Sequence, residues 1–217
     1  MVKLGENWPV YYRDGLADHF HAVGVLVAAW QHVEDSYHAL FQTMGQNDPK
    51  FALFAFDLLG NDSRAQMLGK HFPEACGIQY QEPIDHFLKC AAICKENRNA
   101  IAHSSFSSDQ DPNLLLISKG LDSKRERVRQ YRFSLASLRE MADHTYVTAG
   151  YGLAIFAHVT IVRAAINGDT EWRKKLLAQL PSLDKPPLPR KWVLHNQEPP
   201  QGAPPPQEPS PWSPQSQ

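Results

Sequence analysis

Three residues near the middle of the chain carry side chains that could act together on a phosphodiester. Arg98, Asn99 and His103 follow one another in the order Arg-Asn-x-x-x-His. Arginine has a permanent, forked positive charge that matches phosphate oxygens. Histidine can give or take a proton near neutral pH, and an asparagine amide can orient either partner. These residue types at this spacing indicate acid–base chemistry on a phosphate ester.

The asparagine is what makes the pattern specific. A second arginine, Arg139, also precedes a histidine, His144, by five positions. A pair at that spacing is expected by chance in a chain rich in both residue types. Only Arg98 is followed directly by an asparagine. The stricter pattern therefore occurs once, and we take Arg98, Asn99 and His103 as the candidate catalytic residues.

The motif lies at the end of a predicted amphipathic helix that starts near residue 83. Apolar residues recur along one stripe of this helix, and Arg98 occupies a position on that stripe. Glu34 stands in a similar place on the first predicted helix, between Trp30 and Tyr37. Because an unpaired buried charge is costly, we expect Arg98 and Glu34 to form a supporting ion pair between the two helices.

The remaining periodicity predicts a mainly α-helical bundle with a small β-hairpin insertion. Asp48-Pro49 is a typical cap followed by a first-turn proline, and Pro73 should end a helix two residues earlier. The last long helix starts at a capping box at Ser137 or slightly earlier, at Ser134. The predicted helices span 15–44, 49–60, 61–71, 83–103, 137–167 and 171–179, and the predicted strands span 114–118 and 127–133.

Composition limits the classes of function. The 217 residues carry a net charge of −1, so the chain is not a basic protein that coats nucleic acid. Three cysteines do not make a disulfide framework, and the N-terminus does not resemble a signal peptide. The apolar stretch 147–166 is interrupted by glycines, His158 and Arg163, which favours a buried core helix over a membrane span. We expect a cytoplasmic protein.

Two domain-level regions follow from the proline distribution. Residues 1–180 have the composition of one folded domain. Most of the seventeen prolines lie in residues 181–217, where apolar residues are sparse. Such a composition predicts a disordered tail, and the run Pro186-Pro187-Leu188-Pro189-Arg190 could act as a polyproline ligand.

An Arg-Asn-x-x-x-His motif at the end of a core helix, in an all-α domain with a small hairpin after it, resembles the HEPN superfamily. The likeness covers about residues 15–168, and the motif is its most specific part. Many members of that family are metal-independent endoribonucleases that need no cofactor and dimerise so that two motifs share a cleft. The resemblance thus implies RNA as substrate, a homodimer, and a defence or toxin–antitoxin role with an antitoxin or other protein partner.

The resemblance also implies a role for each motif residue. His103 would act as general acid or base on the ribose 2′-hydroxyl and the leaving oxygen. Arg98 would stabilise the charge that develops on the phosphoryl group. Asn99, one helical turn before His103, would orient the imidazole or contact RNA. The products would be a 2′,3′-cyclic phosphate and a 5′-hydroxyl.

Several alternatives remain open from the residues alone. The motif could belong to a non-catalytic HEPN-like module that binds a nucleotide or a partner, or to a helical scaffold that recruits partners through its tail. Arg127, Arg129 and Tyr131 would share one face of a strand and could contact RNA, although we favour a solvated hairpin. His86, Cys90 and Cys94 could line one helix face as metal ligands, but no fourth ligand is evident, and we predict no metal site.

Overall fold

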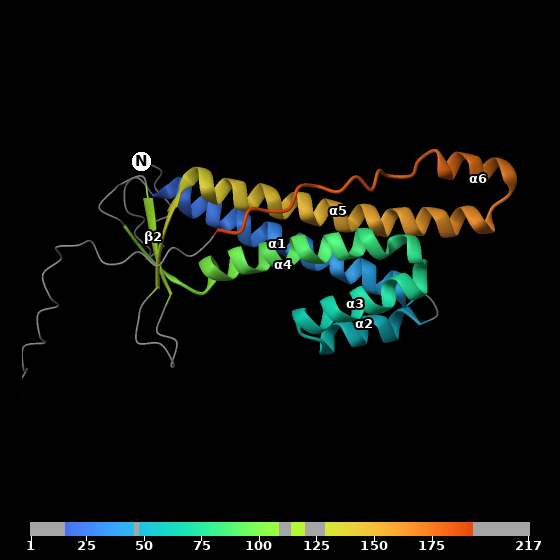
Figure 1. Ribbon diagram of the computed structural model, residues 1–217, viewed down its shortest axis with the longest axis horizontal. Coiled ribbons are helices and arrows are strands. Elements are labelled where there is room, and N and C mark those ends of the chain that lie inside the picture. The colour runs from blue at the N-terminus through green and yellow to red at the C-terminus, as the bar shows by residue number, and fades with distance from the viewer. Residues whose placement is uncertain (1–15, 46–47, 109–113, 120–128, 193–217) are drawn as a thin grey trace, which may run out of the picture.

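The computed structural model describes residues 16–45, 48–108, 114–119 and 129–192. It confirms a mainly helical fold with one small antiparallel sheet (Figure 1). The elements are α1 (Ala17–Met44), α2 (Pro49–Leu58), α3 (Asn61–Cys76), the 3-10 helix η1 (Ile78–Tyr80), α4 (Gln81–Ala102), β1 (Ser105–Ser108), β2 (Leu114–Lys119), β3 (Arg129–Ser134), α5 (Leu135–Asn167) and α6 (Thr170–Leu177).

Three long helices form the body of the molecule. α1 and α5 run side by side in the same direction, and α4 runs the opposite way along them (Figure 1). The three helices pack tightly together at Gly152 of α5. A Cβ atom there would lie 2.6 Å from Phe87 Cε2 of α4 and 2.8 Å from Ser36 Cβ of α1. Glycine is therefore what allows the three backbones to come this close.

Two predicted helix starts are confirmed by side-chain caps. The Asp48 carboxylate accepts a hydrogen bond of 3.0 Å from the backbone N–H of Phe51, and α2 begins at the next residue after the cap. The Ser134 hydroxyl accepts one of 3.2 Å from the backbone N–H of Ser137. α5 thus begins at the earlier of the two predicted positions, because each cap satisfies an N–H that has no partner within the helix.

The predicted end of α3 before Pro73 was wrong, because the helix continues through that proline to Cys76. A proline inside a helix leaves the carbonyl four residues earlier without its helical partner, and here that carbonyl belongs to Gly69. Gln81 at the start of α4 donates a long hydrogen bond, 3.5 Å from its Nε2, to Gly69 O. Tertiary contact thus compensates for part of the hydrogen bond that Pro73 removes.

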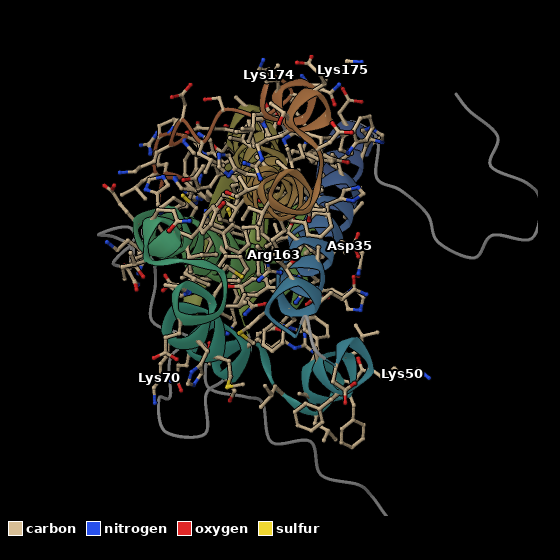
Figure 2. All side chains as sticks on the ribbon, turned by 90° about the vertical axis from the view of Figure 1, so that its right-hand side faces the viewer. Asp35, Lys50, Lys70, Arg163, Lys174 and Lys175 are labelled. Atoms are coloured by element: carbon tan, nitrogen blue, oxygen red, sulfur yellow. The ribbon has the colours of Figure 1, made fainter. Side chains whose placement is uncertain are left out.

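Arg163 of α5 holds two helix ends together at the far end of the bundle. Its Nη1 donates to the carbonyl of Thr43 in α1 at 2.7 Å, and its Nη2 donates to the carbonyl of Ala75 in α3 at 3.2 Å. The end-on view of Figure 2 labels Arg163 near the middle of the bundle, with Lys174 and Lys175 at its edge. A cation at two helix C-termini satisfies carbonyls that have no helical partner.

The sheet contains the predicted hairpin and one additional strand. β2 and β3 pair antiparallel, with Leu115 opposite Phe133, and β1 pairs with the other edge of β2. β1 was not predicted because three of its four residues are serines, which have no strand pattern. Leu115 and Phe133 pack with Leu26, Ile101 and Leu138 in a core cluster separate from that of the main bundle.

One helix in the described part of the chain is long and apolar enough to cross a membrane. It is the segment Leu135–Ile166 of α5, which has an 18-residue window of mean hydropathy 1.5. About a third of that window is buried inside the protein. The core helix of a soluble protein meets the same criterion, so this is weak evidence for a membrane span. α5 packs along α1 and α4.

The disordered tail was predicted to begin at residue 181, which is too early. Residues 181–192, here called the strap, return from α6 along α5 and α4 to the sheet (Figure 1). The strap has no helix or strand, but Leu183 packs against the main core and Trp192 packs against the core cluster of the sheet. Residues 193–217 lie outside the described part of the chain. The folded region thus extends about a dozen residues past the predicted domain boundary.

A tyrosine–histidine contact joins η1 to α5. Tyr80 is buried, and its hydroxyl lies 2.9 Å from His158 Nδ1. Loss of hydration lowers the pKa of His158 below its ordinary value of 6.5, since burial disfavours the charged imidazolium. Neutral His158 can then accept the hydrogen bond from the Tyr80 hydroxyl.

We expect this histidine to make the fold less stable in mild acid. Because its pKa is lowered in the folded state, the unfolded chain takes up the proton more readily. The stabilising contribution is fully present above about pH 6.5 and is lost as the pH falls through the folded-state pKa. His158→Phe should reduce the fall in unfolding free energy between pH 7 and pH 5, measured by urea denaturation. Tyr80→Phe retains the half-buried histidine and should keep most of the wild-type pH dependence; equal slopes for wild type and His158→Phe would contradict this assignment.

Candidate active site

The last turn of α4 positions the three motif residues beside the sheet. α4 ends at Ala102, and His103 is its C-cap residue. Ile101 is fully buried in the core cluster of the sheet, which fixes the end of the helix. The Ser104 hydroxyl donates to the carbonyl of Ala100 at 2.7 Å and so closes the helix end. His103 is exposed at this end, where an imidazole can reach a ligand in solution.

Arg98 is half-buried and retains unused donors. Its Nη1 donates to Asn99 Oδ1 at 3.0 Å. Its Nε is buried and has no hydrogen-bond partner among the described residues. The described ion pairs of α4 belong instead to Lys95, Glu96 and Glu82. A guanidinium that is not neutralised by a carboxylate keeps its charge available for an anion.

The asparagine contacts the arginine and not the histidine. Asn99 Oδ1 accepts from Arg98, so the amide orients the guanidinium. Asn99 and His103 are four residues apart, which places them one above the other along the helix. The arrangement therefore presents a cation, an amide and an exposed imidazole on the final turn and cap of one helix. Such a set can bind a phosphate and exchange a proton with a group beside it.

The predicted ion pair between Arg98 and Glu34 was wrong. Glu34 Oε1 accepts hydrogen bonds from Trp30 Nε1 at 3.1 Å and from Asn61 Nδ2 at 3.4 Å. Glu34 therefore lies against the start of α3, where the positive end of the helix dipole stabilises its carboxylate. Helical periodicity placed both residues on inward faces, but it could not say which neighbouring helix each face meets.

The predicted RNA contact at the hairpin does not hold for Tyr131. The side chain is only 6% exposed and packs against Phe133 in the core cluster of the sheet. A ring in that position cannot stack on a base from solution. Arg129 begins β3, and Arg127 lies outside the described residues. Tyr131 and Phe133 lie on the face of β3 that packs on the helices.

The cysteines of α4 are structural. Cys90 and Cys94 are buried, and His86 Nε2 lies 3.5 Å from Cys90 Sγ. Burial raises the pKa of the Cys90 thiol to about 11, so it is protonated at neutral pH and is a poor nucleophile or metal ligand. Burial also raises the pKa of Cys94. No group of three possible metal ligands occurs among the described residues.

An open pocket lies at the other end of α4. It has a volume of about 460 Å³ and is lined by acidic and basic side chains that include Glu82, Asp85, Lys89 and Lys185. His86 also lines it, about 18 Å from Arg98 at the usual rise of an α-helix. The mixture of charges and this separation make it a distinct surface from the motif.

Two residues near the motif were not predicted. Asn97 is 5% exposed, and its amide holds the strap through the carbonyl of Arg190 and the N–H of Trp192. His144 lies on α5 one turn before Thr148, which contacts Cys94 of α4. Its Nδ1 is buried without a hydrogen-bond partner among the described residues. The sequence signal for His144 was the second Arg-x-x-x-x-His pair, which we attributed to chance.

Comparisons of the chain with protein-family models, with curated proteins and with solved structures find no match.

We expect Arg98 to contribute little to stability. Because no described carboxylate pairs with it, Arg98→Gln should change the free energy of unfolding by less than about 1 kcal/mol. Asn97→Ala removes two hydrogen bonds from a buried amide and should cost about 1–3 kcal/mol. Urea denaturation of both variants tests the difference. A larger loss for Arg98→Gln than for Asn97→Ala would mean that Arg98 is a structural residue.

Proposed function

We propose that the chain is a metal-independent endoribonuclease in which Arg98 and His103 act on the RNA phosphodiester. The observation that carries the proposal is the half-buried Arg98 without a described carboxylate partner, on the same helix end as an exposed histidine. A structural role would give Arg98 an ion pair, and the described residues provide none. The resemblance of the motif to the HEPN superfamily points to the same chemistry.

The proposed reaction needs one proton transfer at each end of the phosphate. A neutral imidazole, His103 or its copy in a second subunit, takes the proton of the ribose 2′-hydroxyl. The 2′-oxygen then attacks phosphorus, and the bond to the 5′-oxygen breaks. An imidazolium returns a proton to the leaving oxygen, which gives a 2′,3′-cyclic phosphate and a 5′-hydroxyl. The Arg98 guanidinium stabilises the negative charge on the phosphoryl oxygens, and Asn99 holds that guanidinium in place.

This function would place the protein in the cytoplasm, in a defence or toxin–antitoxin role with an antitoxin or another protein partner. A non-catalytic nucleotide-binding module would use the same cation and the same exposed imidazole. The two functions differ in whether RNA is cut, so one experiment separates them.

We also propose a homodimer, which would bring two motifs to one cleft. The support is an apolar face on α5 that is exposed in the described part of the chain. Tyr146, Val147 and Leu153 are 43%, 49% and 42% exposed and recur at helical spacing. A Cβ atom on Gly150, between them, would meet nothing within 4 Å. A contiguous exposed apolar face on a long helix is typical of a surface that another protein covers.

We expect wild-type protein to cleave RNA in excess EDTA and to release 2′,3′-cyclic phosphate ends. His103→Ala should reduce the rate by at least about 100-fold, because the proton-transfer group is lost. Arg98→Gln should reduce it by about 100- to 1,000-fold, because charge stabilisation at the phosphoryl group is lost. His71→Ala, on α3 at a distance from the motif, should keep wild-type activity. Cleavage is followed on a mixed-sequence RNA with each variant at equal folded concentration.

Two outcomes would contradict the nuclease proposal. Equal cleavage by wild type and both motif variants would assign the activity to another site or to a contaminant. No cleavage by folded dimeric wild type, together with nucleotide-induced thermal stabilisation that Arg98→Gln abolishes, would instead support the binding module.

The dimer proposal predicts a mass of twice 24.5 kDa for the wild type in size-exclusion chromatography with light scattering. Leu153→Glu should yield the monomer, because it places a charge within the apolar face. Ile166→Glu, at a 64% exposed position near the end of α5, should leave the dimer intact. A monomeric wild type, or equal masses for both variants, would contradict an interface on this face.

A further inference from the structure

The strap is bound to α4 by side chains spread over almost the whole helix. Lys185 forms an ion pair with Glu82, and His86 Nε2 lies 2.8 Å from the carbonyl oxygen of Pro186. Further along, Lys191 Nζ lies 2.6 Å from Glu96 Oε2. Basic residues of the strap thus meet acidic residues of the helix at both ends of the contact.

Asn97 binds the strap in the way that a side chain recognises an extended peptide. Its Nδ2 donates to the carbonyl of Arg190 at 3.0 Å, and its Oδ1 accepts from the N–H of Trp192 at 3.3 Å. The amide therefore pairs with main-chain groups of Arg190 and Trp192, two residues apart, in the way that a neighbouring strand would. Main-chain contacts of this kind require an extended backbone and do not depend on the side chains of the ligand.

The end of the strap also has an aromatic anchor. Trp192 packs edge to face against Phe133 of β3, with ring centroids 6.4 Å apart, and the Arg190 guanidinium lies 4.5 Å from the centre of the Trp192 ring. Pro189, directly before Arg190, is buried. A buried proline and an aromatic anchor, flanked by basic residues, define the side-chain preference of the surface.

The strap is attached less firmly than the helices beneath it. In the described part of the chain it makes no backbone–backbone hydrogen bond to a helix or strand, and most of its side chains are exposed. Two buried polar atoms at the contact, Tyr151 Oη beside His86 and Trp192 Nε1, have no hydrogen-bond partner among the described residues. A segment with few buried contacts and unsatisfied polar atoms opens at a low free-energy cost.

We propose that the surface formed by Glu82, His86, Glu96 and Asn97 is a docking groove for an extended, proline-containing basic segment of a partner protein. The strap occupies this groove as an intramolecular ligand that such a segment displaces. Displacement would leave Asn97 and the Phe133 ring uncovered, and both recognise a ligand of the same chemistry as the strap. The proposal concerns peptide binding and does not depend on RNA cleavage.

The test uses the full chain and a fluorescent peptide with the sequence of residues 181–192. Lys191→Glu combined with Trp192→Ala, the strap variant, weakens the strap and leaves the groove intact. Wild type should bind the peptide weakly, because its own strap is present at a high effective concentration. The strap variant should bind at least about tenfold more tightly by fluorescence anisotropy. Adding Asn97→Asp, which keeps the size of the side chain but removes the donor to the Arg190 carbonyl, should abolish that gain.

Controls make each outcome decisive. A peptide with alanine in place of its tryptophan should bind the strap variant at least about tenfold more weakly. Hydrogen exchange of residues 181–192 should be faster in the strap variant, while circular dichroism should show unchanged helix content. Persistent protection of the strap in that variant would overturn displacement, and peptide binding that survives Asn97→Asp would overturn the groove. A wild-type dimer that the strap substitutions abolish would assign the groove to the strap of a second copy and would also overturn the proposal.

Discussion

The close approach of α1, α4 and α5 at Gly152 is the constraint on which the rest of the structure depends. Phe87 of α4 fills the space that a side chain at this position would occupy. Beside it, the Ser36 hydroxyl of α1 donates to the carbonyl of Ala149 at 2.9 Å. The same hydroxyl also lies 2.8 Å from the carbonyl oxygen of His32 in its own helix, so it bridges α1 and α5 at this level. The position of α4 against α5 then follows from the contact between Phe87 and Gly152.

The register of α4 determines the position of both proposed surfaces, because they lie on the same helix. Cys94 of α4 contacts Thr148 of α5, and Ile101, two turns further, is buried beside the sheet. The final turn of α4 is therefore held between α5 and β3. Within this turn, Asn97 is buried under the strap, whereas the next residue, Arg98, is half-buried and contacts Asn99. Adjacent residues on a helix point about 100° apart, so Asn97 faces the strap while Arg98 faces a different side of the helix.

Periodicity and capping predicted the described α-helices, although not every helix end, because both signals are local in sequence. Asp48 and Ser134 start their helices by satisfying N–H groups three residues away, which a sequence pattern records directly. Pro73 was misread because the contact that compensates for it comes from Gln81, in the next helix. β1 was missed because its pairing with β2, and not its own residues, makes it a strand.

The candidate site was predictable only as a set of residues. The motif itself could be found because Arg98, Asn99 and His103 are close in sequence and share one helix end. Their environment depends on which helix packs where. The carboxylate expected beside Arg98 instead meets Asn61 of α3, and Tyr131 turns toward the core. Inward-facing positions can be counted from periodicity, but their partners are long-range contacts that periodicity does not contain.

The strap shows why low apolar content does not by itself predict disorder. An extended proline-rich segment has no internal hydrogen bonds, so its main chain must find partners in water or on another surface. Here the partners are side chains, His86 for the carbonyl of Pro186 and Asn97 for the main chain beside Trp192. Prolines also lower the entropy that the chain loses on becoming ordered, because φ is already fixed. A helix that presents a few well-placed polar groups can therefore order a segment whose composition alone predicts a flexible tail.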